Sequence, residues 1–299
     1  MIYEKLVSIA KKSKSLVAIG SGNRDEYVQR TVQAAENAAK EGVARVIIVG
    51  NPEHTPATQK TEFHTSPNPQ DTLLRMLSSG EVDAIVRGSL PAADFLKNIK
   101  TRFNAEKLRR IALLETAHGH QFFFAPVGID EGKTTQDKIS FVTDGVNLLE
   151  RLEAAPRVAI LSGGRAGDIG RDPTVDETIK QAQQVVEKAK QQNITQNIKN
   201  YQILIEDAIK EKANLILAPN GISGNLIYRT LIHLGAGASY GAPYTNIPKT
   251  IIDTSRVGPQ KEYIGAITLA SALAKTTHTE TQKHNPHKNP TNNSNYNDK

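Results

Sequence analysis

The sequence predicts an α/β protein made of two mostly parallel α/β domains with an interdomain cleft. Short apolar runs rich in β-branched residues alternate with helix-period segments such as residues 25–42 and 172–192. Continuous apolar strands that alternate with helices are typical of a parallel sheet covered on both faces. Polar residues and glycines follow several of these strands, at the carboxyl ends where such sheets bind ligands. At 299 residues, the chain has room for two domains of ordinary size.

The order of the elements predicts where the domains begin and end. Residues 110–143 break the alternation with apolar runs joined by short polar segments, which favours antiparallel strands and an arm used in dimerisation. A new strand–helix series begins at Pro156, so the first domain is predicted over 1–150 plus 251–275 and the second over 151–250. The polar residues 276–299 are predicted to be a disordered tail. The predicted strands are residues 16–20, 45–50, 83–88, 110–114, 121–125, 139–143, 157–161, 214–218 and 250–254.

Composition excludes several classes of function. The chain has no cysteine, which removes disulfides, thiolate metal sites and cysteine nucleophiles. No apolar run approaches the roughly 18–20 residues that span a bilayer, and the N-terminus has the pattern of an amphipathic helix, so we expect no membrane partner and a cytoplasmic location. The net charge of +6 fits either a solvated basic surface or a small anionic ligand. With 5% aromatic residues and no basic motif, nucleic acid is not expected.

The segment "LAPNGISGNLIYRT" (217–230) is one candidate site at a strand end. It predicts a strand, a tight loop and a helix that begins at "NLIYRT". Gly221 and Gly224 would let a ligand approach the backbone closely. Asn225 would cap the helix or donate to an oxyanion. An ordinary strand-to-helix turn explains the same spacing, and both interpretations stay open.

The segment "IIDTSRVGPQKEYIG" (251–265) is a second candidate site. Ser255 and Arg256 leave a strand together, and a hydroxyl beside a guanidinium suits a phosphate, sulfonate or carboxylate. Glu262 begins the following helix and would act as a general base if it is partly desolvated. The alternative is a surface arginine and a helix-capping glutamate.

Two further strand ends carry polar residues. Arg87 and Gly88 precede a helix whose first turn would bind an anion, and Lys97 lies on that helix. In "FVTDGVN", polar residues follow the predicted strand 139–143. These residues are Thr143, Asp144 and Asn147. Since all of the candidates follow strands, we expect them to converge on one cleft.

The same motifs carry a resemblance to a known family. The order of "VRGSLPAADFLKNI", "FVTDGVN", "APNGISGNLIYR" and "DTSR…E…ITLASALA" resembles the phosphate acetyl/butyryltransferase family over about residues 15–275. Within it, "LIEDAIKE", "GISGNLIYRTL" and "YGAP" are similar to the methanogen proteins called methyltransferase-related protein X (MtxX). The resemblance implies an isocitrate/isopropylmalate-dehydrogenase-like fold.

The resemblance also implies roles for individual residues. Ser255 and Arg256 match the pair that holds the acyl phosphate, and Glu262 matches the carboxylate that deprotonates the thiol of coenzyme A. Lys97 stands where the family usually has an arginine, and an ammonium does not replace a bidentate fork. We expect no tightly bound cofactor and no metal; coenzyme A or another thiol such as coenzyme M would be the co-substrate.

Three functions follow as hypotheses. The leading one is a transferase, expected to be a homodimer, that moves an acyl or methyl-pathway-related group between an anionic donor and a thiol. The alternative is a non-catalytic accessory or ligand-sensing subunit associated with methanogenic methyl transfer. A metal-dependent dehydrogenase of the same fold would need a cluster of aspartates on one helix face, which the sequence lacks.

Overall fold

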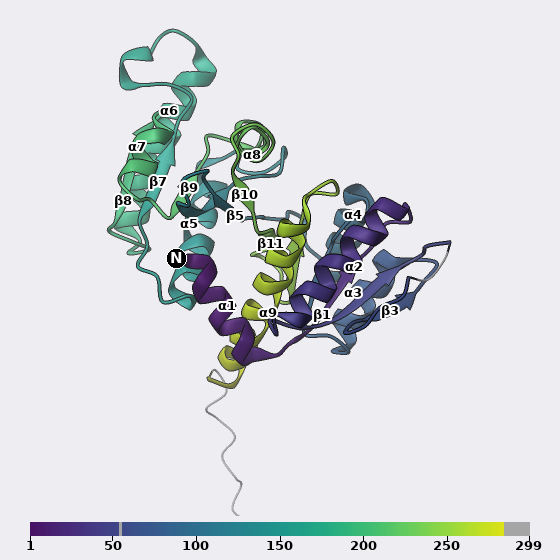
Figure 1. The fold of residues 1–299 in the computed structure, drawn as a ribbon. Helices are drawn as coiled ribbons and strands as arrows, with labels where there is room; N and C mark the ends of the chain where they lie inside the picture. The colour runs from purple at the N-terminus through teal and green to yellow at the C-terminus, as the bar shows by residue number, and fades with distance from the viewer. Residues whose placement is uncertain (54–55, 284–299) are drawn as a thin grey trace, which may run out of the picture.

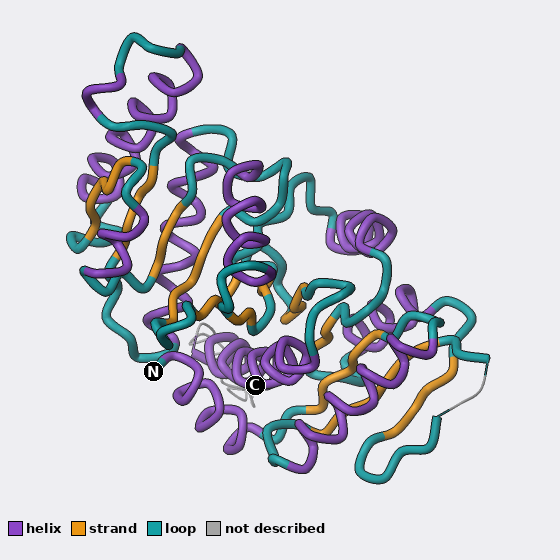
Figure 2. Tube along the Cα trace, turned by 45° about the horizontal axis from the view of Figure 1, so that its top comes forward, coloured by secondary structure: helices purple, strands orange, loops and turns teal. Residues whose placement is uncertain are grey.

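The protein consists of two six-stranded, mostly parallel sheets with helices packed on their faces. A computed structural model describes residues 1–53 and 56–283, and all structural statements concern these residues. The strands form two groups in Figures 1 and 2, and the groups meet where residues 110–113 run beside residues 241–244. A mixed α/β fold is therefore confirmed. None of the helices in these two stretches is long and apolar enough to cross a membrane.

The first sheet has the strand order β11-β12-β4-β1-β2-β3. Every neighbouring pair is parallel except β11 with β12. Alternate residues of β1 face opposite layers: Val17 and Ile19 pack with α2 and α9, whereas Ala18 packs with α3 and α4. The elements are β1 (Leu16–Gly20), α2 (Asp25–Lys40), β2 (Arg45–Gly50), β3 (Glu62–Thr65), α3 (Pro69–Ser79), β4 (Ala84–Val86), α4 (Ala92–Phe103), β11 (Ala242–Pro243), β12 (Thr250–Asp253) and α9 (Gln260–Lys283).

The second sheet has the strand order β10-β5-β6-β9-β7-β8. Its pairs are parallel from β6 to β8, and β5 is antiparallel to both of its neighbours. Helices α5 and α6 pack on this sheet, as do α7 and α8. The elements are β5 (Ala112–Glu115), β6 (Gln121–Ala125), α5 (Thr135–Arg151), β7 (Val158–Leu161), the 3₁₀ turn η1 (Ala166–Asp168), α6 (Pro173–Gln191), β8 (Ile198–Gln202), α7 (Ile205–Lys210), β9 (Leu215–Leu217), α8 (Gly221–His233) and β10 (Ala238–Ser239).

The first and last helices join the two halves. The helix α1 (Ile2–Ser13) packs along α9, and both lie between the sheets in Figure 1. The backbone N–H of Tyr3 also donates to the side chain of Gln121 on β6. The chain itself crosses from the first sheet to the second between α4 and β5, and it returns between β10 and β11.

The predicted strand 139–143 is wrong, because these residues lie within α5. Thr134 caps the helix: its side chain accepts from the N–H of Asp137, and the Asp137 carboxylate accepts from the N–H of Thr134. Ile139, Val142, Val146 and Leu149 are buried at helical spacing. A short apolar run fits a buried strand and a helix face equally well, and the helical spacing of the buried residues becomes visible only beyond Val142.

The prediction for 110–143 is confirmed only for its first part. β5 and β6 form an antiparallel hairpin, but β6 also pairs in parallel with β9 and is buried along its whole length. The hairpin is therefore part of the core rather than a projecting arm.

The division of the strands between the two sheets does not coincide with the predicted domain limits. β5 and β6 precede residue 151 and lie in the second sheet, whereas β11 lies in the first. The domain limits themselves stay a prediction. Residues 276–283 continue α9 and residues 284–299 lie outside the described part of the chain, so the disordered tail stays a prediction.

Candidate active site

A cavity of about 390 Å³ is lined by residues of both sheets. From the first sheet come residues that follow the carboxyl ends of β4 and β12, which is where parallel sheets hold ligands. From the second sheet come residues of β5, α8 and β10. The lining includes Arg87, Asp253, Thr254, Ser255, Arg256, Val257 and Glu262 on one side, and Arg110, Val127, Asn225, Tyr228, Arg229 and Ser239 on the other.

Glu262 is a buried carboxyl group at this cavity, with 1% of the residue exposed. Its Oε1 atom accepts from the N–H of Ser255 at 2.8 Å and, more weakly, from the hydroxyls of Tyr228 at 3.4 Å and Ser239 at 3.5 Å. Its Oε2 atom is buried and forms no hydrogen bond with any described atom. Burial raises the pKa of Glu262 to about 7, against the opposing hydrogen bond from Ser255. A carboxyl group with a pKa near neutrality is suited to proton transfer.

The loop 255–258 between β12 and α9 is held in place from several directions. Tyr263 donates from its hydroxyl to the carbonyl oxygens of Ser255 at 3.3 Å and Arg256 at 3.0 Å. Gly258 donates from its backbone to the carbonyl oxygen of Ser255 at 3.1 Å. A Cβ atom at Gly258 would lie 2.1 Å from Oε2 of Glu262, so only glycine leaves room for the carboxyl group. The loop and the carboxyl group therefore form one fixed unit.

Arg256 and Arg229 supply positive charge at the cavity. Both residues line it and are exposed, and in the described part of the chain neither forms an ion pair with a carboxylate. The Arg256 guanidinium lies 5.3 Å from the ring centroid of Tyr27 on α2. Neither guanidinium is neutralised by a described carboxylate, and binding of an anion by Arg256 stays a prediction.

Arg87 lines the cavity, but its guanidinium already donates hydrogen bonds to other groups of the protein. The Nε atom donates to the carboxylate of Asp253, and the two terminal nitrogens donate to the carbonyl oxygens of Leu90 and Thr254. Burial alone would raise the pKa of Asp253, but Arg87 and Arg110 outweigh it and hold the pKa below its usual value. Arg87 therefore supports the wall of the cavity and adds to its positive potential, and a bidentate contact with a ligand would break these bonds.

A buried chain of charges continues from Asp253 into the second sheet. Arg110 donates to Asp253 at 3.0 Å and to Glu131 at 2.7 Å. Glu131 in turn accepts from the backbone N–H of Gly128 with its side chain, and from that of Gly221 with its carbonyl oxygen. The chain thus connects β12 of the first sheet with the start of α8 on the second.

The loop before α8 differs from its prediction. The helix begins at Gly221 and is capped by Asn220, whose side chain accepts from the N–H of Ser223 at 3.0 Å. A Cβ atom at Gly221 would lie 1.8 Å from the carbonyl oxygen of Gly128, and one at Gly224 would lie 1.9 Å from that of Pro126. The two glycines therefore let the helix approach the protein's own loop after β6 rather than a ligand.

Asn225 lines the cavity but does not cap the helix. Its Nδ2 atom donates to the carbonyl oxygen of Val127 at 3.0 Å, within the same contact between α8 and the loop after β6.

Two residues of the "RGSLPAADFLK" motif lie away from the cavity lining. Gly88 adopts φ of +61°, and a Cβ atom there would lie 1.9 Å from the carbonyl oxygen of Gly20, so it serves a tight backbone crossing. Lys97 is exposed on α4 and does not line the cavity. The contact between Lys97 and a ligand therefore stays a prediction.

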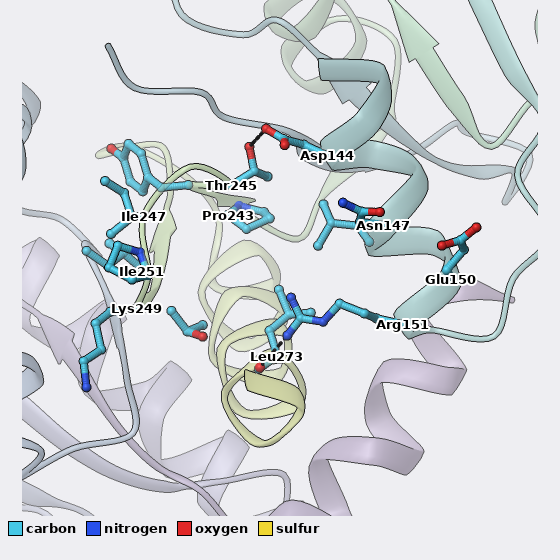
Figure 3. Close-up of a pocket in the computed structure, with 14 residues that line it drawn as sticks. Asp144, Asn147, Glu150, Arg151, Pro243, Thr245, Ile247, Lys249, Ile251 and Leu273 are labelled. Atoms are coloured by element: carbon cyan, nitrogen blue, oxygen red, sulfur yellow. Dashed lines mark hydrogen bonds between the residues drawn. The ribbon is translucent and has the colours of Figure 1, made fainter. Parts of the chain in front are cut away.

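Two of the three residues predicted at 143–147, Asp144 and Asn147, line a different hollow, shown in Figure 3. This hollow of about 940 Å³ lies between α5, the segment 243–251 and α9. Asp144 accepts from Nε of Arg109 at 2.7 Å and from the hydroxyl of Thr245 at 2.6 Å. Thr143 donates to the carbonyl oxygen of Ile139 in its own helix, and Asn147 lines the hollow. The structure therefore separates these residues from Glu262.

Sequence reasoning missed several residues of the cavity. Tyr228 lies within a motif quoted for its glycines, and Asp253 lies two residues before Ser255, so both had a signal in the sequence. Ser239 and Arg110 had none, because a two-residue strand and the start of an apolar run carry no pattern that points to a site. Within residues 1–53 and 56–283, no group of three or more His, Cys, Asp or Glu side chains could hold a metal ion.

The fold is that of the phosphotransacylase class of α/β proteins. The model of the family described as phosphate acetyl/butaryl transferase matches residues 64–271, and the chain belongs to this family. It is 40% identical over 274 residues to a protein of Methanosarcina mazei named putative methyltransferase mtx subunit X, covering 91% of this chain and 95% of that protein. A protein of Methanosarcina barkeri with the same name is 41% identical over 266 residues, covering 89% and 95%.

Solved structures agree with this assignment at the level of the fold. A phosphotransacetylase from Streptococcus pyogenes matches with a TM-score of 0.69 at 18% identity, over 92% of this chain and 98% of that one. At this identity, the likeness shows the fold alone.

Proposed function

We propose that the chain is a transferase that moves an acyl group, or a group related to the methyl pathway, from an anionic donor to a thiol acceptor. The substrates bind in the cavity of Ser255, Arg256 and Glu262, in an interdomain cleft of the isocitrate/isopropylmalate-dehydrogenase type. The observation that carries the proposal is the buried Glu262, whose pKa is raised to about 7 beside a loop that carries a hydroxyl and an unpaired guanidinium.

In the proposed reaction, Glu262 accepts the proton of the thiol. Attack of the sulfur on the acyl carbon then forms the C–S bond and breaks the bond to the phosphate oxygen, which leaves a thioester and inorganic phosphate. Arg256 and the hydroxyl of Ser255 hold the phosphate and stabilise the charge that develops on it. Tyr228 and Ser239 orient the carboxyl group through Oε1.

A thiol-dependent assay tests this proposal. Release of phosphate from acetyl phosphate and butyryl phosphate is measured with coenzyme A or coenzyme M as acceptor. Turnover that is lost in Arg256→Ala and kept in Arg45→Ala supports the transferase, since Arg45 is exposed on β2 and lines a separate hollow. Turnover with neither thiol and neither donor contradicts it.

The alternative is a non-catalytic accessory or ligand-sensing subunit. The exposed position of Lys97 favours this alternative. The family's motif places a cation for the phosphate at this position, but the Lys97 side chain does not line the cavity. The name of the Methanosarcina relatives, a subunit of a putative methyltransferase, points the same way. Binding of a phosphate-bearing thiol without any turnover is the outcome that this alternative predicts.

The proposal includes a cytoplasmic homodimer. Ile222 and Leu226 on α8 are 62% and 61% exposed, and Ile129 in the adjacent loop is 66% exposed. A second copy of the chain would cover this apolar surface. Light scattering of the purified protein gives the mass, and a monomer at micromolar concentration would contradict the dimer.

A further inference from the structure

Two consecutive residues at the end of β10 contact two consecutive residues of α9. On the cavity side, the hydroxyl of Ser239 donates to Oε1 of Glu262 at 3.5 Å. The next residue, Tyr240, faces away from the cavity and lines a separate hollow together with Lys261. The Nζ atom of Lys261 lies 5.3 Å from the centroid of the Tyr240 ring, within the range of a cation–π contact. The end of the strand and the first turn of the helix therefore touch on two sides, at the cavity and behind it.

Tyr240 is 3% exposed, and three elements hold its side chain. Its hydroxyl donates to Oε2 of Glu115, at the end of β5, at 2.7 Å. Its ring stacks on that of Tyr3 in α1, with centroids 4.3 Å apart and planes at 25°. A Cβ atom at Gly265 would lie 2.6 Å from the ring, so α9 packs directly on Tyr240. The ring is thus fixed against α1, β5 and α9 together.

Glu115 connects these contacts to Lys261. Its Oε2 atom also accepts from Nε2 of Gln121 on β6 at 2.6 Å, and its Oε1 atom lies 3.5 Å from Nζ of Lys261. Burial alone would raise the pKa of Glu115, but the bonds from Gln121 and Tyr240 outweigh it and hold the pKa below its usual value. The carboxylate is therefore charged at neutral pH. Because Lys261 is 59% exposed, its ion pair is weak, and the buried Tyr240 provides the firmer contact with α9.

We propose that Tyr240, Glu115 and Lys261 form a clamp behind the cavity, which positions Glu262 against Ser239 and keeps water away from its carboxyl group. None of the three residues lines the cavity, so each is a positioning residue. The inference rests on the proposed role of Glu262 as the proton acceptor, and it makes that role depend on residues outside the cavity. When the clamp is weakened, the end of β10 and the first turn of α9 separate, and water reaches Glu262.

The clamp acts on Glu262 through burial rather than through charge. Burial is the largest cause of the raised pKa of Glu262. Among the groups that face this carboxyl group, Asp253 on β12 raises the pKa, whereas Arg87 after β4 and the hydroxyl of Tyr228 on α8 lower it. The hydroxyl of Tyr263 on α9 is also close enough to feel the charge of Glu262. None of these groups belongs to the clamp. An uncharged substitution at Tyr240 therefore keeps the charges around Glu262 and changes the access of water.

Infrared titration of the full chain tests the clamp. The difference spectrum between a protein and its Glu262→Gln form isolates the C=O stretch of the protonated carboxyl group, and the loss of this band with rising pH gives the pKa. We expect Tyr240→Phe, which lacks only the bond to Glu115, to lower this pKa by about 0.5, and Tyr240→Leu, which also lacks the ring, to lower it by about 1. The limb of the pH profile of kcat/KM should move to lower pH by the same amounts.

The second sheet carries a matched control with the same three residue types. Tyr201 on β8 donates to Oε2 of Glu211 at 2.9 Å, and Lys199 donates to the same oxygen at 2.5 Å. The Nζ atom of Lys199 also lies 6.0 Å from the centroid of the Tyr201 ring. These residues do not line the cavity. Tyr201→Phe and Tyr201→Leu should therefore leave the pKa of Glu262 unchanged.

Tyr240→Phe is the decisive variant, because it keeps the packing of the ring, and thermal melting verifies that it is folded. An unchanged pKa of Glu262 in this variant would overturn the proposal, as would an equal decrease in Tyr201→Phe. The infrared titration needs no turnover. A lowered pKa in a chain that transfers no acyl group would keep the clamp and contradict the transferase, whereas turnover with an unchanged pKa would do the opposite.

Discussion

The carboxyl group of Glu262 accepts a hydrogen bond from the backbone N–H of Ser255 at 2.8 Å, across the turn that joins β12 to α9. This bond fixes the proposed proton acceptor relative to the proposed phosphate-binding residues, since Ser255 and Arg256 are adjacent in the chain. It also leaves the second carboxyl oxygen without a partner in the described part of the protein. The bond therefore fixes the orientation of the carboxyl group in the cavity wall.

The first prediction concerns the pH dependence of transfer. With a pKa of about 7 for Glu262, the carboxylate that accepts the proton is the minor form at pH 6 and the major form at pH 8. We expect kcat/KM to rise with pH through about 7 and then level off. Glu262→Gln should lower kcat by about 10²–10⁴-fold and remove this limb of the profile. A profile of kcat/KM that is flat from pH 5.5 to 8 would contradict the assignment.

A second prediction concerns stability. The pKa of Glu262 is raised from 4.5 to about 7 by burial, so the folded state favours the protonated carboxyl group. The resulting stabilisation is full below pH 4.5 and is lost as pH rises through about 7. At about 1.4 kcal/mol per pKa unit, the loss is ~3 kcal/mol. Glutamine does not ionise, so the Glu262→Gln variant does not undergo this loss. Between pH 4.5 and pH 8, its free energy of unfolding should therefore rise by this amount relative to that of the wild type. Urea unfolding of both proteins at each pH measures the difference, and a constant difference would show an ordinary pKa.

A third prediction concerns the charges that connect the two sheets. Arg110→Met leaves Asp253 and Glu131 buried without their shared cation, which should lower the free energy of unfolding by about 3–5 kcal/mol. The matched control is Arg75→Met, because Arg75 pairs with Glu81 on the surface, where half of each side chain is exposed. Such a pair contributes about 0–1 kcal/mol. Equal midpoints of urea unfolding for the two variants would show that the buried chain does not hold the sheets together.

Secondary structure could be predicted from the sequence where a single local pattern determines it. The run "QFFFA" is apolar along its length and lies in the sheet interior over the predicted residues 121–125. The run 139–143 failed because five apolar-rich residues fit a buried strand or a helix face equally well, and only the spacing to Leu149 separates the two.

The candidate site was predictable only where its residues are neighbours in the chain. Ser255, Arg256 and Glu262 lie within eight consecutive residues, so the sequence shows them together. Ser239 reaches the cavity through the pairing of β10 with β5, and Arg110 through its bridge to Tyr244, and no local pattern encodes either contact.

A fourth prediction tests the close approach of α8 to the loop after β6. In Gly221→Ala, the added Cβ would lie 1.8 Å from the carbonyl oxygen of Gly128, so the helix must shift. We expect a loss of about 1–3 kcal/mol in the free energy of unfolding, together with a lower kcat/KM, because Tyr228 on the same helix moves away from Glu262. Gly167→Ala is the control, since nothing lies within 4 Å of its added Cβ. If both variants have wild-type stability, the close contact is not present in solution.

The last prediction distinguishes the structure from the family resemblance at Lys97. The resemblance implies a phosphate contact there, whereas the structure places Lys97 on the exposed surface of α4, outside the cavity lining. If the structure is right, Lys97→Ala changes kcat/KM by less than about twofold, and Lys97→Arg brings no gain although it restores the residue typical of the family. Arg256→Ala, measured in the same assay, shows the loss expected for a cation that does contact the phosphate. A loss of tenfold or more in Lys97→Ala, with unchanged melting temperature, would mean that α4 moves towards the cavity when substrate binds. In that case Lys97 would belong to the site, and a closed form of the protein would be the one that catalyses transfer.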